Sequence, residues 1–124
     1  MGRMNITHVQ VVSVPVADQD RAKSFYADTL GFTVIADQPM GDEGRWVQVG
    51  PKGSKTSLTL VTWFPTMPAG SLNGLVLETT DIDGDAAALA GAGVEVDGPH
   101  DEFWGRHATF RDPDGNGIVL RQAR

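Results

Sequence analysis

The chain has 124 residues, a length that fits one domain with a modest hydrophobic core. Its formal net charge of -6 argues against nucleic acid or an anionic membrane as a partner, because both repel an acidic protein. It contains no cysteine, which excludes disulfides, thiol nucleophiles and thiolate metal ligands. The N-terminal residues lack the apolar run of a signal peptide and no segment reaches membrane-spanning length, so we expect a soluble cytoplasmic protein.

The first half of the chain predicts one strand, one helix and three further strands. Alternating apolar residues favour a strand over residues 6–16. Asp18 can cap a helix that runs to about Leu30, and Gly31 supplies its left-handed stop. The next strands are expected at residues 32–36, 45–50 and 57–64, with a loop at residues 37–44 between the first two.

The second half repeats this order after a linker at residues 65–71. A strand at residues 74–79 precedes a helix that Asp81 or Thr80 caps and that ends near Ala92 before Gly93. The helix has Ile82, Ala86 and Leu89 on its buried side, and a short strand at residues 94–96 follows. Two βαβββ units, residues 5–64 and 72–122, therefore make up a single domain over residues 1–124 with an α+β fold.

A hairpin over residues 105–120 ends the second unit. Its turn, Asp112-Pro113-Asp114-Gly115, has the residue types of a type I turn. Alternation puts His107, Thr109 and Arg111 on one face of the first strand and their neighbours on the other. This face therefore holds the side chains of the hairpin that could bind a polar ligand or transfer a proton.

Two motifs give the chain a family resemblance. Residues 14–26, VPVADQDRAKSFY, with Leu30-Gly31-Phe32, and residues 110–116, FRDPDGN, resemble the vicinal oxygen chelate superfamily of glyoxalases, bleomycin and fosfomycin resistance proteins and extradiol dioxygenases. Both motifs are structural, since they contain a helix start, a helix stop and a turn. The resemblance implies a partly closed, cupped mixed sheet with the helices outside, a ligand on its concave side and, commonly, a homodimer.

The superfamily usually holds a divalent metal ion with histidine and glutamate side chains. The resemblance places the four ligand positions at Val11, Thr59, Gly74 and Val119. None is an imidazole or carboxylate, the groups that such a metal prefers. His8, His100 and His107 fall on different faces or elements and do not replace them. We therefore expect no metal and no other cofactor, and we set aside the metal-dependent glyoxalase and dioxygenase hypotheses.

The resemblance also assigns residues to the concave face, which is mostly apolar and typical of a small-molecule pocket. Residues 100–104, including Trp104, are expected as a loop that covers its mouth. Ser13, Trp46, Gln48, Thr59, Trp63, Trp104, His107, Thr109, Arg111 and Arg121 are the candidate ligand-binding residues. The face further contains Val9, Val11, Val61, Val76 and Val119.

Three functions stay open. The first is a metal-free protein that binds a planar or aromatic small molecule, similar to the bleomycin-resistance members. The second is a metal-independent isomerase, epimerase or lyase that uses His107 or Glu78 as general base and Arg111 or Arg121 to hold an anionic substrate. The third is a protein-interaction module. Structural alternatives also stand: the tryptophans as core or dimer contacts, His107 as a hydrogen-bonded structural residue, and Arg111 as the ion-pair partner of Asp112.

Overall fold

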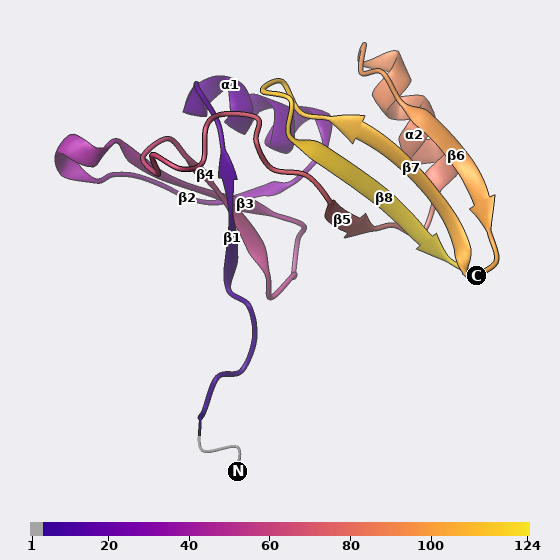
Figure 1. Cartoon of the computed structure of the whole chain (residues 1–124), viewed down its shortest axis with the longest axis horizontal. Helices are drawn as coiled ribbons and strands as arrows, with labels where there is room; N and C mark the ends of the chain where they lie inside the picture. The colour runs from indigo at the N-terminus through magenta and orange to yellow at the C-terminus, as the bar shows by residue number, and fades with distance from the viewer. Residues whose placement is uncertain (1–3) are drawn as a thin grey trace.

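The structure is a computed structural model that describes residues 4–124, in which two βαβββ arrangements follow one another (Figure 1). The first comprises β1 (Val11–Pro15), α1 (Gln19–Ser24) with a π-helical turn (Phe25–Thr29), β2 (Thr33–Pro39), a 3₁₀ turn (Gly41–Glu43), β3 (Arg45–Gly50) and β4 (Ser57–Val61). The second comprises β5 (Leu75–Glu78), α2 (Ile82–Gly91), β6 (Asp97–Glu102), β7 (Gly105–Arg111) and β8 (Gly117–Ala123).

The strands form two four-stranded mixed sheets. The N-terminal sheet has the order β1-β4-β3-β2, and the C-terminal sheet has the equivalent order β5-β8-β7-β6. In each sheet the first strand pairs in parallel with the last one, and the other pairs are antiparallel. The predicted α+β fold of two βαβββ units is confirmed. Among residues 4–124, no helix is long and apolar enough to cross a membrane.

Both helices begin where the sequence predicts. The Asp18 carboxylate accepts a hydrogen bond of 3.1 Å from the Arg21 amide, and the Asp81 carboxylate accepts one of 3.0 Å from the Gly84 amide. Asp81, and not Thr80, is thus the cap of α2. Each cap satisfies an amide that has no partner inside its helix.

One hydrophobic core joins the two sheets. Alternate residues of every central strand face the helices, and these side chains form a single buried cluster: Val14, Val16, Ala22, Phe25, Tyr26, Val47, Val49, Leu58, Leu60, Ile82, Leu89, Ala108, Phe110, Ile118 and Leu120. The residues between them point to the opposite side of each sheet, which we call its open face. Because both helix-covered faces contribute to the same core, both open faces point away from it.

The turn between β7 and β8 forms a clasp between the two halves of the chain. The buried Asp112 carboxylate accepts hydrogen bonds of 2.8 Å from the Tyr26 hydroxyl and from the Asn116 side-chain amide. It also accepts the backbone amides of Asp114 and Asn116, each at 2.9 Å. The Asn116 amide in turn donates to the Pro15 carbonyl oxygen at 2.8 Å. Burial, reinforced by Asp112, raises the pKa of Tyr26 far above its ordinary value, so the phenol stays a donor.

Three predicted strand boundaries in the first half are wrong. The first strand begins at Val11 and not at residue 6, because its pairing with β4 starts at Val11 and Ser57. Residues 4–10 are exposed and extend away from both sheets (Figure 1). The second strand continues to Pro39, into the predicted loop, because Pro39 pairs with Arg45. The fourth strand ends at Val61 and leaves Trp63 outside the sheet.

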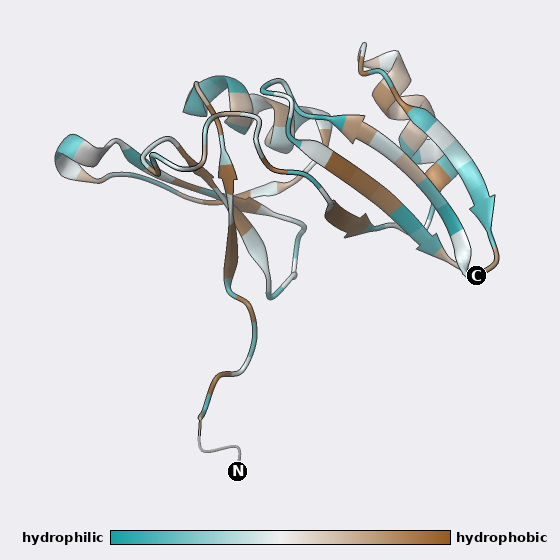
Figure 2. Ribbon diagram, in the orientation of Figure 1, coloured by the Kyte–Doolittle hydropathy of each residue, from teal (hydrophilic) through white to brown (hydrophobic). Residues whose placement is uncertain are grey.

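The third strand of the second half lies later than predicted. It spans Asp97–Glu102 instead of residues 94–96, whereas Val94 and Val96 pack against the core without pairing. Figure 2 shows this edge strand as hydrophilic, whereas the middle of β8 is apolar. His100 and Glu102 therefore belong to a strand and not to the predicted covering loop, of which only Phe103 and Trp104 remain as a turn.

Candidate functional site

The open face of the N-terminal sheet carries a chain of hydrogen-bonded polar side chains. The Trp46 indole N–H donates to Gln48 at 3.0 Å, and the Gln48 amide donates to the Ser57 hydroxyl at 2.7 Å. The hydroxyl oxygens of Ser13 and Thr59 lie 3.4 Å apart beside this chain. Each group thus has a partner within the face, which fixes its orientation.

The open face of the C-terminal sheet carries a row of four side chains, which we call the cross-strand row. Backbone pairing aligns Glu78 with Arg121, Arg121 with His107, and His107 with His100, so one residue comes from each strand. Arg121 donates to the Glu78 carboxylate at 3.0 Å. The Glu78 carboxylate, one of the two candidate general bases, therefore has a cationic partner.

Trp104 lies against this row. The Arg121 guanidinium carbon is 5.0 Å from the centre of the Trp104 ring, which is a cation–π distance. The His107 ring centre is 6.0 Å from that of Trp104 and 5.4 Å from that of His100. Trp104, half-buried in the turn before β7, therefore places an aromatic surface next to the only histidine that the sequence directs to the concave side.

One imidazole nitrogen of the row has no hydrogen-bond partner. His107 Nδ1 is buried, and the nearest carboxylate oxygen of Glu102 is 3.6 Å away, beyond a normal hydrogen bond. A buried polar atom without a partner costs free energy, so a small shift that brings Glu102 within hydrogen-bond distance would be favourable.

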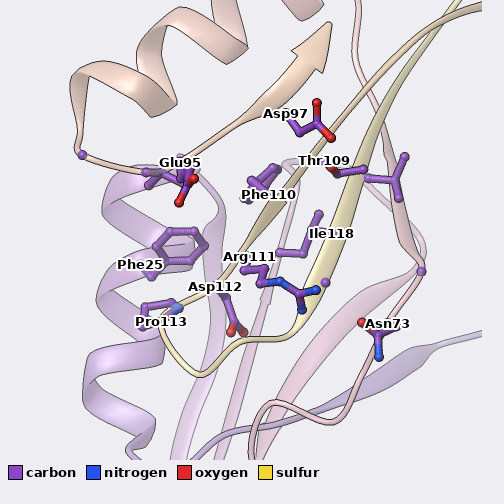
Figure 3. Close-up of a pocket in the computed structure, with 15 residues that line it drawn as sticks. Phe25, Asn73, Glu95, Asp97, Thr109, Phe110, Arg111, Asp112, Pro113 and Ile118 are labelled. Atoms are coloured by element: carbon purple, nitrogen blue, oxygen red, sulfur yellow. The ribbon is translucent and has the colours of Figure 1, made fainter. Parts of the chain in front are cut away.

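A cavity of about 720 Å³ adjoins the same face near the β7–β8 turn, with Thr109, Arg111, Val119 and Asn73 in its wall. Figure 3 shows Arg111 and Thr109 on one side of β7, with Phe25, Glu95 and Pro113 on the other. The Arg111 guanidinium donates to the Gly115 carbonyl at 2.8 Å. The expected Arg111–Asp112 ion pair is therefore wrong, because the Asp112 carboxylate points inward to the clasp.

Apart from Trp63, the candidate residues fall into two groups, one on each open face. Trp63 follows β4 and lies beside Phe64, with ring centres 6.0 Å apart. The N-terminal group contains Ser13, Trp46, Gln48 and Thr59; the C-terminal group contains Glu78, Trp104, His107, Thr109, Arg111 and Arg121. Their roles stay predictions.

Two residues of the site were not among the candidates. Ser57 lies two positions before Thr59 on the same strand, so the alternation of side chains along the strand is the signal that could have found it. Glu102 was assigned to a loop, and the pairing of Glu102 with Gly105 in the β6–β7 hairpin was needed to bring it near His107.

The metal positions of the superfamily do not fit a metal ion here. The four positions lie on or beside strands β1, β4, β5 and β8, and none supplies a good metal ligand: Val11 and Val119 are apolar, the Thr59 hydroxyl is bonded to Ser13, and Gly74 has no side chain. Within residues 4–124, no three His, Asp or Glu side chains lie close enough to one another to hold a metal ion.

Two βαβββ arrangements, each with an open face, define the class of protein. Residues 5–120 match the model of the Glyoxalase/Bleomycin resistance protein/Dioxygenase superfamily, and the chain belongs to this family.

Relatives with solved structures resemble the whole chain. It is 60% identical to TnmS3, an antibiotic binding protein from Streptomyces sp. CB03234, over 98% of this chain and 100% of that one, with a TM-score of 0.94. A glyoxalase/bleomycin resistance protein from the same organism is 59% identical over 93% and 100%, with a TM-score of 0.86. The Bacillus subtilis (strain 168) protein YetH is 38% identical over 94% of this chain and 99% of its own.

Proposed function

We propose that the protein binds a small, partly aromatic molecule on its open faces without a metal ion. The observation that carries this proposal is the cross-strand row with Trp104 beside it and a cavity along the same strands. An aromatic ring, an imidazole and two guanidinium groups on one concave surface are typical of a pocket that recognises a flat polar ligand. The name of the relative TnmS3, an antibiotic binding protein, supports the same class of function.

Tryptophan fluorescence tests the proposal. The chain has three tryptophans, so Trp46→Phe, Trp63→Phe and Trp104→Phe each remove one reporter. Titration of the wild-type protein with a library of aromatic antibiotics should give saturable quenching. Trp104→Ala should weaken the affinity of a binder about tenfold, as expected for a lost stacking contact of about 1.4 kcal/mol. A library without any saturable binder would refute the proposal.

We further propose that the protein is a homodimer. Residues 4–10 carry apolar side chains with nothing of their own chain to cover them, since Met4, Ile6 and Val9 are 77%, 80% and 60% exposed. A second copy would bury this segment and supply a further open face opposite the ligand. Sedimentation velocity should show a dimer that Ile6→Asp with Val9→Asp converts to a monomer. A wild-type monomer across the micromolar range would contradict the dimer.

A metal-independent isomerase, epimerase or lyase is the second candidate, favoured by the His107 imidazole on the open face, with a Glu102 carboxylate oxygen 3.6 Å from its Nδ1. In this role His107 removes a proton from a bound substrate, whereas Glu78 is already bonded to Arg121. Once a turnover assay is found, His107→Gln should abolish turnover; unchanged turnover would exclude the assignment. A cytoplasmic location stays a prediction that cell fractionation checks.

A further inference from the structure

We propose that the ligand is an elongated aromatic acid whose acidic group binds Arg111 while its ring lies against Trp104 and His107. This inference rests on the proposed binding function and names the chemistry of the ligand. It divides the open face of the C-terminal sheet into an aromatic end at the cross-strand row and a cationic end at the cavity beside the β7–β8 turn.

The first step is the charge of Arg111. Arg121, the other arginine of this face, already pairs with Glu78 and lies over Trp104. Arg111 instead donates to a carbonyl oxygen, which holds one side of the guanidinium and leaves its positive charge without a bonded carboxylate. The turn carboxylate Asp112 is unavailable to it, because that group accepts four hydrogen bonds in the clasp. A guanidinium group in this state is suited to a carboxylate ligand, which it can bind through two parallel hydrogen bonds.

The second step is the space around Arg111. Backbone pairing places Gly117 directly beside it on β8, and Gly117 has no side chain to fill the position. A Cβ atom on Gly117 would lie 2.8 Å from the Asn73 side-chain oxygen. The surface next to the guanidinium therefore consists of the Gly117 backbone and the Asn73 side-chain amide. Thr109, two residues before Arg111, adds a hydroxyl on the same face. These neutral polar groups can hydrogen-bond an anion without competing for the guanidinium charge.

Besides Asp112, two carboxylates line the cavity, and neither is bonded to Arg111. The Asp97 carboxylate is bound by the His100 ring at 2.7 Å. Glu95 lies across β7 from the Arg111 side chain, on the side of Phe25 and Pro113 (Figure 3). On the open-face side of the cavity, Arg111 is therefore a cation to which none of the described carboxylates is bonded, whereas the Asp97 carboxylate there is hydrogen-bonded to His100.

The third step is length. His107 and Arg111 are four residues apart on β7, which corresponds to about 13 Å along a strand. Thr109 and Val119 pair between them and form a flat, partly apolar floor. A molecule that reaches both ends has two or three fused or linked rings and an acidic group at one end.

A matched pair of probes tests the inference: biphenyl-4-carboxylate and its neutral analogue biphenyl-4-carboxamide, titrated by calorimetry at pH 7. We expect the carboxylate to bind the wild-type protein at least about tenfold more tightly, the lower end of the range for charge-assisted hydrogen bonds. Arg111→Gln should reduce this preference to about one without changing the affinity for the carboxamide. Added salt should weaken the carboxylate complex more than the carboxamide complex.

Arg106→Gln is the matched control. Arg106 lies on the same strand but pairs with Asp83 and Asp101, so both affinities should stay at their wild-type values. Equal binding of both probes by the wild type, or a preference that survives Arg111→Gln, would overturn the assignment of Arg111 while the binding function stands. Binding of neither probe would overturn the ligand class, and the antibiotic library decides separately whether the protein binds small molecules.

Discussion

The hydroxyl of Tyr26 provides a direct test of the clasp between the two halves of the chain. Tyr26→Phe removes one oxygen atom and keeps the ring, which packs edge-to-face on Phe25 at 5.3 Å and lies 6.0 Å from Phe32. The change therefore isolates the hydrogen bond to Asp112, whose other donors stay in place. Any loss of stability reports on that bond and not on a cavity in the core.

A hydrogen bond to a charged acceptor contributes about 1.5–3 kcal/mol. Because the Asp112 carboxylate keeps three other donors, we expect a loss of about 2 kcal/mol in the free energy of unfolding. For 124 residues the entropy of unfolding is about 0.26 kcal/mol/K, so this loss lowers Tm by about 8 °C.

Differential scanning calorimetry and urea unfolding of both proteins give the two quantities independently. Arg106→Gln, which removes two surface ion pairs, should leave Tm within about 1 °C of the wild-type value. A Tyr26→Phe protein as stable as the wild type would show that the clasp does not hold the halves together.

The remaining predictions concern pH and two glycines. Because the pKa of Tyr26 is raised in the folded state, stability should be complete below pH 10, where the unfolded tyrosine keeps its proton, and should fall above it by up to about 1.4 kcal/mol per pH unit. Tyr26 is the only tyrosine, so tyrosinate absorbance at 295 nm should appear together with unfolding; earlier titration would contradict its burial. Gly70→Ala should cost about 2 kcal/mol or more by urea unfolding, because φ is +81° and the new Cβ would lie 2.1 Å from the Asp114 carbonyl oxygen. Gly91→Ala, in α2 with open space around it, should instead add about 0.5–1 kcal/mol; a loss there would refute the comparison.

The sequence predicts which helices and strands form more accurately than it predicts where each strand begins and ends. Helix caps and stops depend on neighbouring residues, so Asp18 and Asp81 mark both helix starts. Strand ends depend on where a partner strand ends, which local alternation does not contain. The edge strand β6 is the extreme case: its residues, DGPHDE, have low strand propensity, and only pairing with β7 makes them a strand.

Alternation along strands also predicts which residues share a face but not which groups they bond. His107, Thr109 and Arg111 lie on the open face, as their spacing indicates. The partner of Arg111 was predicted wrongly because Asp112 is its neighbour in sequence, whereas Tyr26 and Asn116, the actual partners of that carboxylate, are 86 and 4 residues away. The contact with Tyr26 is long-range and leaves no signal in the sequence around Asp112.

The clasp also has a consequence for folding during synthesis, because the first half of the chain cannot form all of its buried hydrogen bonds alone. The Tyr26 hydroxyl donates to Asp112, which lies 86 residues further along the chain. The Pro15 carbonyl accepts from Asn116, which lies 101 residues further along. Until the last hairpin leaves the ribosome, the nascent first half therefore carries polar groups that it cannot both bury and satisfy. The two units have the same order of elements, yet these buried hydrogen bonds form only when both are present.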